Sequence, residues 1–198
     1  MYVFYVLLMG NCNHVKILSY SLLLGLLVCA CSPTRNTMTS KAYHDLTAHY
    51  NGYFYALEEI AKIEDAIEKA HVNDYNRILK IFPSFDSTLA NSYEKESEEA
   101  IKMASIAIQR HPNSKWLDDA YIAVGQARHY NLDWGNAIQT FKFVNTKSKE
   151  PDARHLAIIR LIRTFTVHNE LDNAQAAIEF LQRQSLSKAN IKLFLLDK

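Results

Sequence analysis

The side chains best suited to chemistry in this sequence are its three cysteines, because a thiol can be a nucleophile, a metal ligand or an attachment site. Cys12, Cys29 and Cys31 all lie within the first 31 residues, and the 167 residues that follow contain none. The later part of the chain therefore has no disulfide, no Cys-bearing metal site and no Cys nucleophile. The chemistry of these cysteines must belong to the N-terminal segment.

Cys29 and Cys31 stand at the end of an uncharged stretch, residues 17–30, that begins after Lys16. Its 14 residues fit the apolar core of a signal peptide, whereas a transmembrane helix needs about 20. The run Val28-Cys29-Ala30-Cys31 is similar to a bacterial lipobox, with an aliphatic residue three positions before the modified cysteine and a small one just before it. The resemblance implies that residues 1–30 are a lipoprotein signal peptide and that Cys31 carries the lipid. An uncleaved membrane anchor with incidental cysteines is the alternative.

The remaining polar residues match no catalytic, nucleotide-binding or metal-binding motif. His44 and His49 are five residues apart, so on a helix they point about 140° apart and do not converge on a metal. His111 stands at a helix end, where we expect a capping role as a cation. The carboxylates of residues 58–68 are typical of a solvated helix face with neighbouring lysines. We therefore expect no catalytic residues, no cofactor and no metal.

Composition favours a helical protein without a nucleic-acid partner. The chain has 198 residues, 48% of them hydrophobic, and only 5 Gly and 4 Pro, which favours helices over a sheet. Lys16 is the only charged residue among the first 31, so the 21 later basic residues balance the 21 acidic ones. Nucleic-acid binding needs a concentrated basic surface, which this balance argues against.

The elements that would present a binding surface are helix pairs that repeat along the chain. Their spacing resembles the tetratricopeptide (TPR) repeat, in which small residues let two antiparallel helices approach and an aromatic residue fills the groove between repeats. The first copy contains Tyr121, Val124, Gly125, Ala137 and Phe141. The second copy contains Ile158, Leu161, Ile162, Ala174 and Ile178, with Ala174 placed 37 residues after Ala137. Ala100 and Ala104 indicate a partial copy upstream.

A long amphipathic helix is predicted before the repeats. Apolar residues recur every three or four positions from Leu46 to Ile67, with Tyr50, Tyr53 and Leu57 on the face expected to be core. We divide the chain into a signal peptide (1–30), a polar tether (31–40), an N-terminal helical segment (41–85) and TPR-like repeats (86–198), the last incomplete. The predicted fold is all-α: a long N-terminal helix, then antiparallel helix pairs in a right-handed superhelix.

Four stretches carry a more specific likeness, with their order and spacing kept from about residue 31 to residue 150. They are residues 43–54, 74–79 with 82–83, 100–104 with 108–111, and 115–121. Together they resemble the N-terminal part of the TPR lipoproteins of Bacteroidota gliding motility and type IX secretion, the SprE and PorW group. Members of that group are several times longer, so the resemblance does not extend to functions of their distal repeats.

The resemblance implies a lipid-anchored scaffold that mediates protein–protein interactions in type IX secretion and gliding motility. Its partners would be proteins of that machinery, and Cys31 would fix it to the outer membrane. No acidic run follows Cys31, which favours a side facing the periplasm. The expected partner-binding residues are Tyr55, Phe54, Gln126, Arg128 and His129. The alternatives are a TPR lipoprotein of outer-membrane protein assembly resembling BamD, or a glycan-binding lipoprotein of the SusD type.

Overall fold

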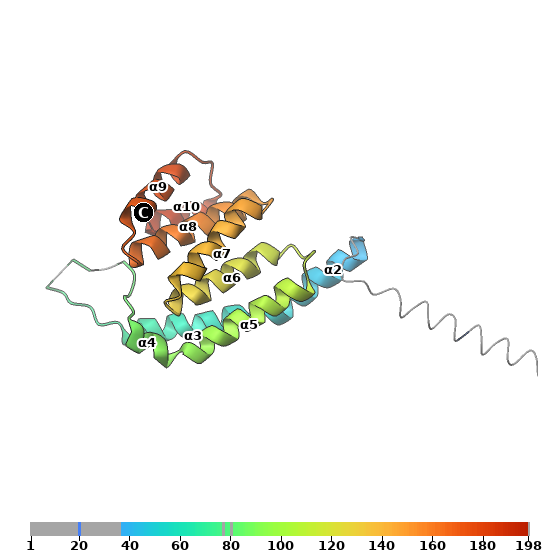
Figure 1. Ribbon diagram of the computed structural model, residues 1–198, viewed down its shortest axis with the longest axis horizontal. Coiled ribbons are helices and arrows are strands. Elements are labelled where there is room, and N and C mark those ends of the chain that lie inside the picture. Colours follow the sequence, from blue (N-terminus) through green and yellow to red (C-terminus); the bar gives the residue numbers. More distant parts are fainter. Residues whose placement is uncertain (1–19, 21–36, 77, 80, 198) are drawn as a thin grey trace, which may run out of the picture. The chain divides into compact units, whose positions relative to one another are not determined.

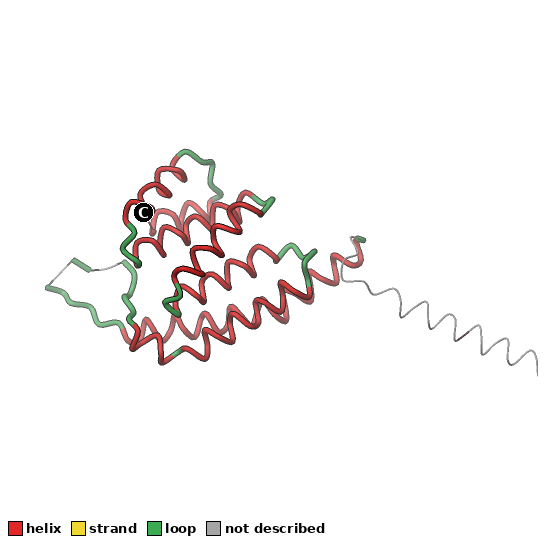
Figure 2. The backbone as a smooth tube through the Cα atoms, in the orientation of Figure 1, coloured by secondary structure: helices red, strands yellow, loops and turns green. Residues whose placement is uncertain are grey.

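The computed structural model describes residues 20, 37–76, 78–79 and 81–197. Asn36–Lys198 forms one compact unit, and every regular element described in it is a helix (Figures 1 and 2). The all-α prediction is therefore confirmed. The lipidation site predicted at Cys31 lies outside the described residues, as do the predicted signal peptide except residue 20 and most of the predicted tether.

Neighbouring helices in the chain pack side by side in order. The elements are α2 (Met38–Thr47), the π-helical segment η1 (Ala48–Tyr53), α3 (Phe54–Ala70), α4 (Ser87–Ser92), α5 (Glu94–Arg110), α6 (Leu117–Tyr130), α7 (Trp134–Lys147), α8 (Pro151–Val167), α9 (Leu171–Gln182) and α10 (Lys188–Asp197). The run from α2 through η1 to α3 is continuous, and α5 returns beside it in the opposite direction (Figure 1). Helices α6 to α9 then pack each against the next, and α10 packs on α8.

Helix α2 begins earlier than the sequence suggested. The Thr37 hydroxyl accepts a hydrogen bond from the Ser40 backbone N–H at 3.3 Å, which caps the first turn at Met38. Residues 38–40 are therefore helical, and the predicted tether of residues 31–40 extends three residues too far. The long N-terminal helix expected from the apolar spacing is present from there onward.

The buried face of this long helix differs from the predicted one. Ala48, Gly52 and Ala56 face the core, while Tyr50 is 61% exposed and Leu57 is 39% exposed. The cause is η1, because a π-helical turn holds more residues than an α-helical turn and rotates the side chains that precede it. The prediction that Tyr50 and Leu57 belong to the core is therefore wrong.

Gly52 explains why small residues take that buried face. A Cβ atom at this position would lie 2.8 Å from the Met103 carbonyl oxygen and 2.9 Å from the Ala107 Cβ. The long helix therefore approaches the backbone of α5 too closely for any larger residue.

Two of the connections between helices are copies of each other, 37 residues apart. In the α6–α7 turn the Asp133 N–H bonds to the Arg128 carbonyl at 2.9 Å, and in the α8–α9 turn the Glu170 N–H bonds to the Phe165 carbonyl at 2.8 Å. The residue before each donor is left-handed, with φ of 59° at Leu132 and 62° at Asn169. The interval is the same as that between Ala137 and Ala174. The internal repeat indicated by side-chain spacing is thus also present in the backbone.

The seam between α6 and α7 depends on Gly125. A Cβ atom there would lie 2.5 Å from a ring carbon of Phe141, whose side chain is fully buried. Ala137 on the same seam is also fully buried. Helices α6 and α7 thus touch at Gly125, and the Phe141 ring lies against α6 within this pair.

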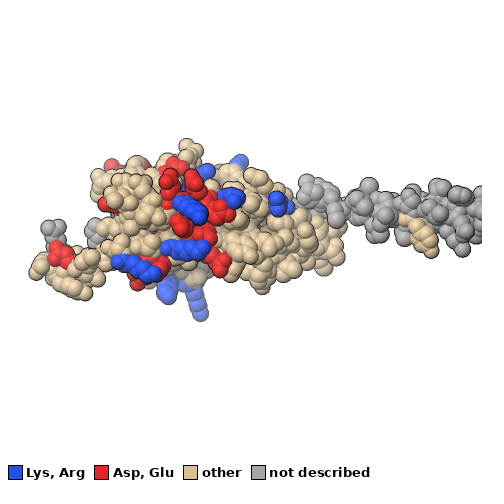
Figure 3. Space-filling model, turned by 90° about the horizontal axis from the view of Figure 1, so that it is seen from below, with Lys and Arg blue, Asp and Glu red and all other residues tan. Residues whose placement is uncertain are grey.

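The outer face of α3 and α5 is charged and solvated. Figure 3 shows Lys and Arg interleaved with Asp and Glu over the middle of the face seen from below. Ion pairs join Lys62 to Glu59, Lys69 to Asp65 and Lys102 to Glu99, each within one helical turn. Such pairs contribute little to stability and serve mainly to keep the surface soluble.

Candidate binding groove

A groove runs between α3, α6, α8 and α10, and residues 81–85 lie across it. On one side of these residues is a pocket of about 630 Å³, and on the other a pocket of about 570 Å³. Ile81, Pro83, Phe85 and Arg163 line both pockets. We call the two pockets together the groove, and residues 81–85 the crossing segment.

Repeat-equivalent residues line the groove. Gln126, His129 and Tyr130 on α6 line a small pocket in its floor, of about 10 Å³. The residues 37 positions later, Arg163, Thr166 and Val167 on α8, line the 570 Å³ pocket. Equivalent positions of α6 and α8 therefore line neighbouring pockets, which share Arg163.

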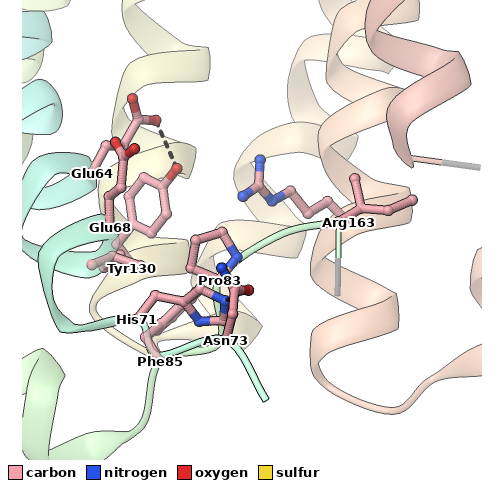
Figure 4. Close-up of a pocket in the computed structure, with 10 residues that line it drawn as sticks. Glu64, Glu68, His71, Asn73, Pro83, Phe85, Tyr130 and Arg163 are labelled. Carbon is pink, nitrogen blue, oxygen red and sulfur yellow. Dashed lines mark hydrogen bonds between the residues drawn. The ribbon is translucent and has the colours of Figure 1, made fainter. Parts of the chain in front are cut away.

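Acidic groups from α3 stand opposite a cation from α8 in the larger pocket (Figure 4). The Glu64 carboxylate accepts hydrogen bonds from the Tyr130 hydroxyl at 2.7 Å and from the Gln126 amide at 3.2 Å. Arg163 extends toward this group from the other wall. Burial and the neighbouring Glu64 raise the pKa of Tyr130 to about 12, so its hydroxyl stays protonated and donates.

Aromatic contacts hold the crossing segment in place. The guanidinium carbon of Arg163 lies 3.9 Å from the centre of the Phe82 ring, which is a close cation–π contact. The Phe85 ring meets His129 and Tyr130 edge-on, with centroid distances of 5.6 and 5.7 Å. Phe82, Pro83 and Phe85 remain half-buried rather than enclosed.

The floor of the groove contains polar atoms without a protein partner. Within the described part of the chain these include His129 Nε2, Arg160 Nε and Asp197 Oδ1, all of which are buried. Burial, with Arg163 and Arg160 nearby, lowers the pKa of His129 to about 3, so this ring is neutral. Burial raises the pKa of the Asp197 carboxyl, and the same two arginines partly oppose that rise. The floor therefore offers unused hydrogen-bonding groups and two cations.

The predicted partner-binding residues fall into three places, two on α6 and one on the N-terminal helix. Gln126 and His129 line the groove floor, but His129 is only 3% exposed and its Nδ1 pairs with the Thr164 hydroxyl at 3.0 Å. That burial does not fit the expected direct surface contact for His129. Arg128 donates to the Thr140 hydroxyl at 2.8 Å, across the α6–α7 seam, and lines none of these pockets.

Phe54 and Tyr55 lie on an exposed stripe of the long N-terminal helix, apart from the groove. Phe54 is 43% exposed and Tyr55 49%, so both are accessible as predicted. Their neighbours along the helix are also exposed, and the stripe contains Tyr43, Leu46, Tyr50, Phe54, Tyr55 and Leu57. We call these residues the aromatic stripe. Tyr53 does not belong to it, because its ring stacks on Trp116 at a centroid distance of 5.6 Å.

The two histidines considered for metal binding have other partners. His44 Nδ1 meets His111 Nδ1 at 2.8 Å in a buried hydrogen bond, which requires one of the two nitrogens to lack a proton. Burial, His44 and Arg110 lower the pKa of His111. His111 does occupy the C-cap of α5, but the expectation that it acts there as a cation is wrong. His49 instead packs on Trp116 at 4.2 Å.

Sequence reasoning missed the residues that shape the groove. Glu64 was assigned to a solvated face, and Tyr130 and Arg163 stood out in no motif. One available signal was the crossing segment itself, where two phenylalanines flank a proline inside a long connection between helices. Connections longer than about 12–15 residues are uncommon and are often functional.

Comparison with known proteins adds no assignment. No protein-family model matches the chain, and a search of curated proteins returns no significant match. In the described residues, no three His, Cys, Asp or Glu side chains gather as a metal site would require. None of the described helices is long and apolar enough to cross a membrane.

Proposed function

We propose that this protein is a lipid-anchored TPR scaffold that holds a protein partner of the type IX secretion or gliding machinery at the outer membrane, facing the periplasm. In this proposal the helix pairs form a right-handed superhelix and Cys31 carries the lipid. The groove and the aromatic stripe are the two surfaces offered to partners. Its action is positional, because the lipid fixes one end and the repeats hold another protein.

The observation that carries this proposal is the lining of one groove by repeat-equivalent residues. Tyr130 on α6 and Val167 on α8 occupy the same position in two copies and line the two pockets of the groove, and the equivalent pair Gln126 and Arg163 lines the small pocket of about 10 Å³ beside it. Repeat proteins of this kind bind peptides or helices on the surface that successive equivalent helices share. The likeness of residues 31–150 to the secretion lipoproteins supplies the proposed machinery.

Crosslinking in a gliding Bacteroidota host tests the proposed partner. We would express the tagged full chain, crosslink intact cells and identify the proteins that co-purify. We expect ring or translocon components of the type IX system to be recovered. Replacing Tyr55 by Ala should reduce that recovery if the aromatic stripe is a contact. The matched control is Tyr75→Ala, an exposed tyrosine outside both surfaces. Recovery of outer-membrane assembly proteins instead would support the BamD-like alternative.

Metabolic labelling with a radioactive fatty acid tests the anchor independently. We expect the wild-type chain to be labelled and to sediment with membranes. Cys31→Ser should lose both properties, while Cys12→Ser should keep them. Label that persists in Cys31→Ser would contradict the assignment of the lipid to this residue.

A further inference from the structure

We propose that the crossing segment is a built-in ligand of the groove, and that the partner binds there through an extended segment with two aromatic residues around a proline. The inference rests on the proposed function, because it names the kind of partner that the scaffold takes. It goes beyond that function by assigning the site, the chemistry of the ligand and an internal competitor.

The crossing segment has the form of a bound peptide. It comes from the connection between α3 and α4, residues 71–86, and its aromatic contacts are made with α6 and α8, which are distant in sequence. Phe85 also packs against the core cluster of α3, α5 and α6. Phe82 rests on Arg163, and Phe85 rests on Tyr130 and His129. Two aromatic rings therefore use two separate positions in the groove, one on each of two repeat-equivalent helices.

The segment does not fill the space it crosses. Pockets of about 630 and 570 Å³ remain on its two sides, and Ile81 is 72% exposed. A loop that served only to complete the core would leave less room, since protein interiors are close-packed. The groove therefore has the capacity for a longer or better-fitting segment than the one it holds.

The ends of the connection allow the segment to leave without unfolding its neighbours. Helix α3 ends at Ala70, followed by His71 in an extended conformation. Helix α4 has its own cap, in which the Asp86 carboxylate accepts from the Leu89 N–H at 2.9 Å. Both helix ends are thus stabilised outside the crossing segment, so a partner that takes the place of residues 81–85 has to replace the packing of Phe85 on the core cluster but not the ends of α3 and α4.

The chemistry of the groove also selects the ligand. Arg163 favours an aromatic face, and the unpartnered Arg160 Nε favours a backbone carbonyl or an acidic group. His129 Nδ1 donates to the Thr164 hydroxyl, which itself donates to the Arg160 carbonyl, so the neutral ring leaves Nε2 as an acceptor for a backbone N–H. An extended segment leaves its backbone carbonyls free, and a proline keeps it extended. A purely aliphatic helix would use neither the cation nor these polar atoms.

Peptide binding in trans tests the proposal. The probe is a fluorescein-labelled peptide with the sequence of residues 79–88, and fluorescence anisotropy measures its affinity for the full chain. Wild type should bind it weakly, because the attached copy competes. Phe82→Ala weakens the attached copy and should bind the peptide about fivefold tighter. Replacing residues 81–85 by Gly-Ser-Gly-Ser-Gly should raise the affinity further.

Matched variants separate groove binding from non-specific effects. Arg163→Met in the Gly-Ser variant should lose at least about tenfold in peptide affinity. Arg183→Met, at an exposed arginine outside the groove, should lose none. Phe143→Ala, at a phenylalanine that is 43% exposed on α7, should bind like wild type. A peptide with alanine at both phenylalanine positions should not bind.

The outcomes decide between a ligand site and an ordinary loop. The proposal is overturned if Phe82→Ala and the Gly-Ser variant keep their helical circular dichroism and cooperative melting but bind no peptide. It is also overturned if Arg163→Met binds as well as its parent. Failure of the crosslinking experiment with successful peptide binding would instead reject the secretion machinery as partner and leave the site standing.

Discussion

The helix pairs α6–α7 and α8–α9 fill the seam between their two helices with different combinations of residues. In the first pair the seam position on α6 is Gly125, and the large Phe141 fills the space it leaves. In the second pair the equivalent positions hold Ile162 and Ile178, which belong to one hydrophobic cluster. One seam is small against large, and the other is medium against medium. What is preserved across the repeat is an apolar seam between the paired helices rather than the residue at either side.

The same two copies differ in the burial of their equivalent residues near the groove. His129 is buried in the first copy, whereas Thr166, its equivalent, is exposed in the second. The turn that follows has the same backbone in both, but it holds the partly buried Leu132 in one and the exposed Asn169 in the other. Each of these differences can be tested by placing the residue of one copy at the equivalent position of the other.

The largest effect should come from giving the first seam the residue of the second. Gly125→Ile places a branched side chain where even a Cβ would lie 2.5 Å from Phe141. We expect a loss of about 4 kcal/mol in the free energy of unfolding, at the upper end for overpacked cores. Urea denaturation followed by circular dichroism would measure it.

The compensating change makes this prediction specific. Adding Phe141→Ile converts the first seam into the second and should recover at least half of the loss. Gly135→Ile is the matched control, since nothing lies within 4 Å of a Cβ at that exposed position. If the double variant is no more stable than Gly125→Ile alone, the fit of Phe141 against Gly125 is not the reason for the pairing.

The reverse change at the second seam should cost less. Ile162→Ala removes a fully buried side chain and leaves a cavity, which should lower the free energy of unfolding by about 3 kcal/mol. Ile178→Phe should restore part of that in the double variant by filling the cavity from the other helix. An Ile162→Ala/Ile178→Phe chain that is less stable than Ile162→Ala would show that the second seam cannot adopt the arrangement of the first.

These contrasts also show why the repeats could be predicted and the N-terminal helix only in part. The repeat spacing is local, since Gly125, Ala137 and Phe141 lie within two neighbouring helices of ordinary α geometry. In the N-terminal run, the helix was predictable from the same kind of spacing, but its buried face was not. Segment η1 changes the number of residues per turn and so changes which side chains face the core. No residue type in 48–53 predicts a π-helical turn.

The groove was beyond sequence reasoning for a different reason. Its defining contacts join residues that are far apart in the chain, such as Phe82 with Arg163 and Glu64 with Tyr130. Gln126 and His129 were predicted from the repeat to lie on the inner face of α6, and both line the small pocket beside the groove. How deeply His129 is buried depends on how α8 packs over α6. The residue spacing within α6 does not predict that packing.

The buried histidine should make the first copy sensitive to pH. The unfolded chain takes up a proton on His129 near its ordinary pKa of 6.5, whereas the folded protein does so only near pH 3. The unfolded state therefore binds more protons between these values. The stabilising contribution is complete above pH 6.5 and falls by about 1.4 kcal/mol for each pH unit below it. Urea denaturation at pH 7, 6 and 5 would measure the slope.

Two substitutions test whether the pH dependence of the free energy of unfolding comes from the buried His129. His129→Asn keeps a group that can bond to the Thr164 hydroxyl but does not titrate, so stability should fall overall while the slope becomes shallower. Thr166→His adds a histidine at the equivalent exposed position and should leave the slope of wild type unchanged. An unchanged slope in His129→Asn would mean that other groups, such as the His44–His111 pair, produce it.

The smallest effect should come from the equivalent turns. Asn169 has a φ of 62°, which asparagine tolerates better than alanine. Asn169→Ala should therefore lower the free energy of unfolding by about 1 kcal/mol, and Asn169→Gly should raise it by a few tenths.

At Leu132, with a φ of 59°, the side chain also packs against the core cluster of α3, α5 and α6. Leu132→Gly relieves the backbone but loses that contact, so we expect a net loss of about 1 kcal/mol. Thermal unfolding of the three variants and of wild type would compare their stabilities. Equal stabilities of Asn169→Ala and Asn169→Gly would contradict a left-handed residue in this turn, and with it the backbone equivalence of the two copies.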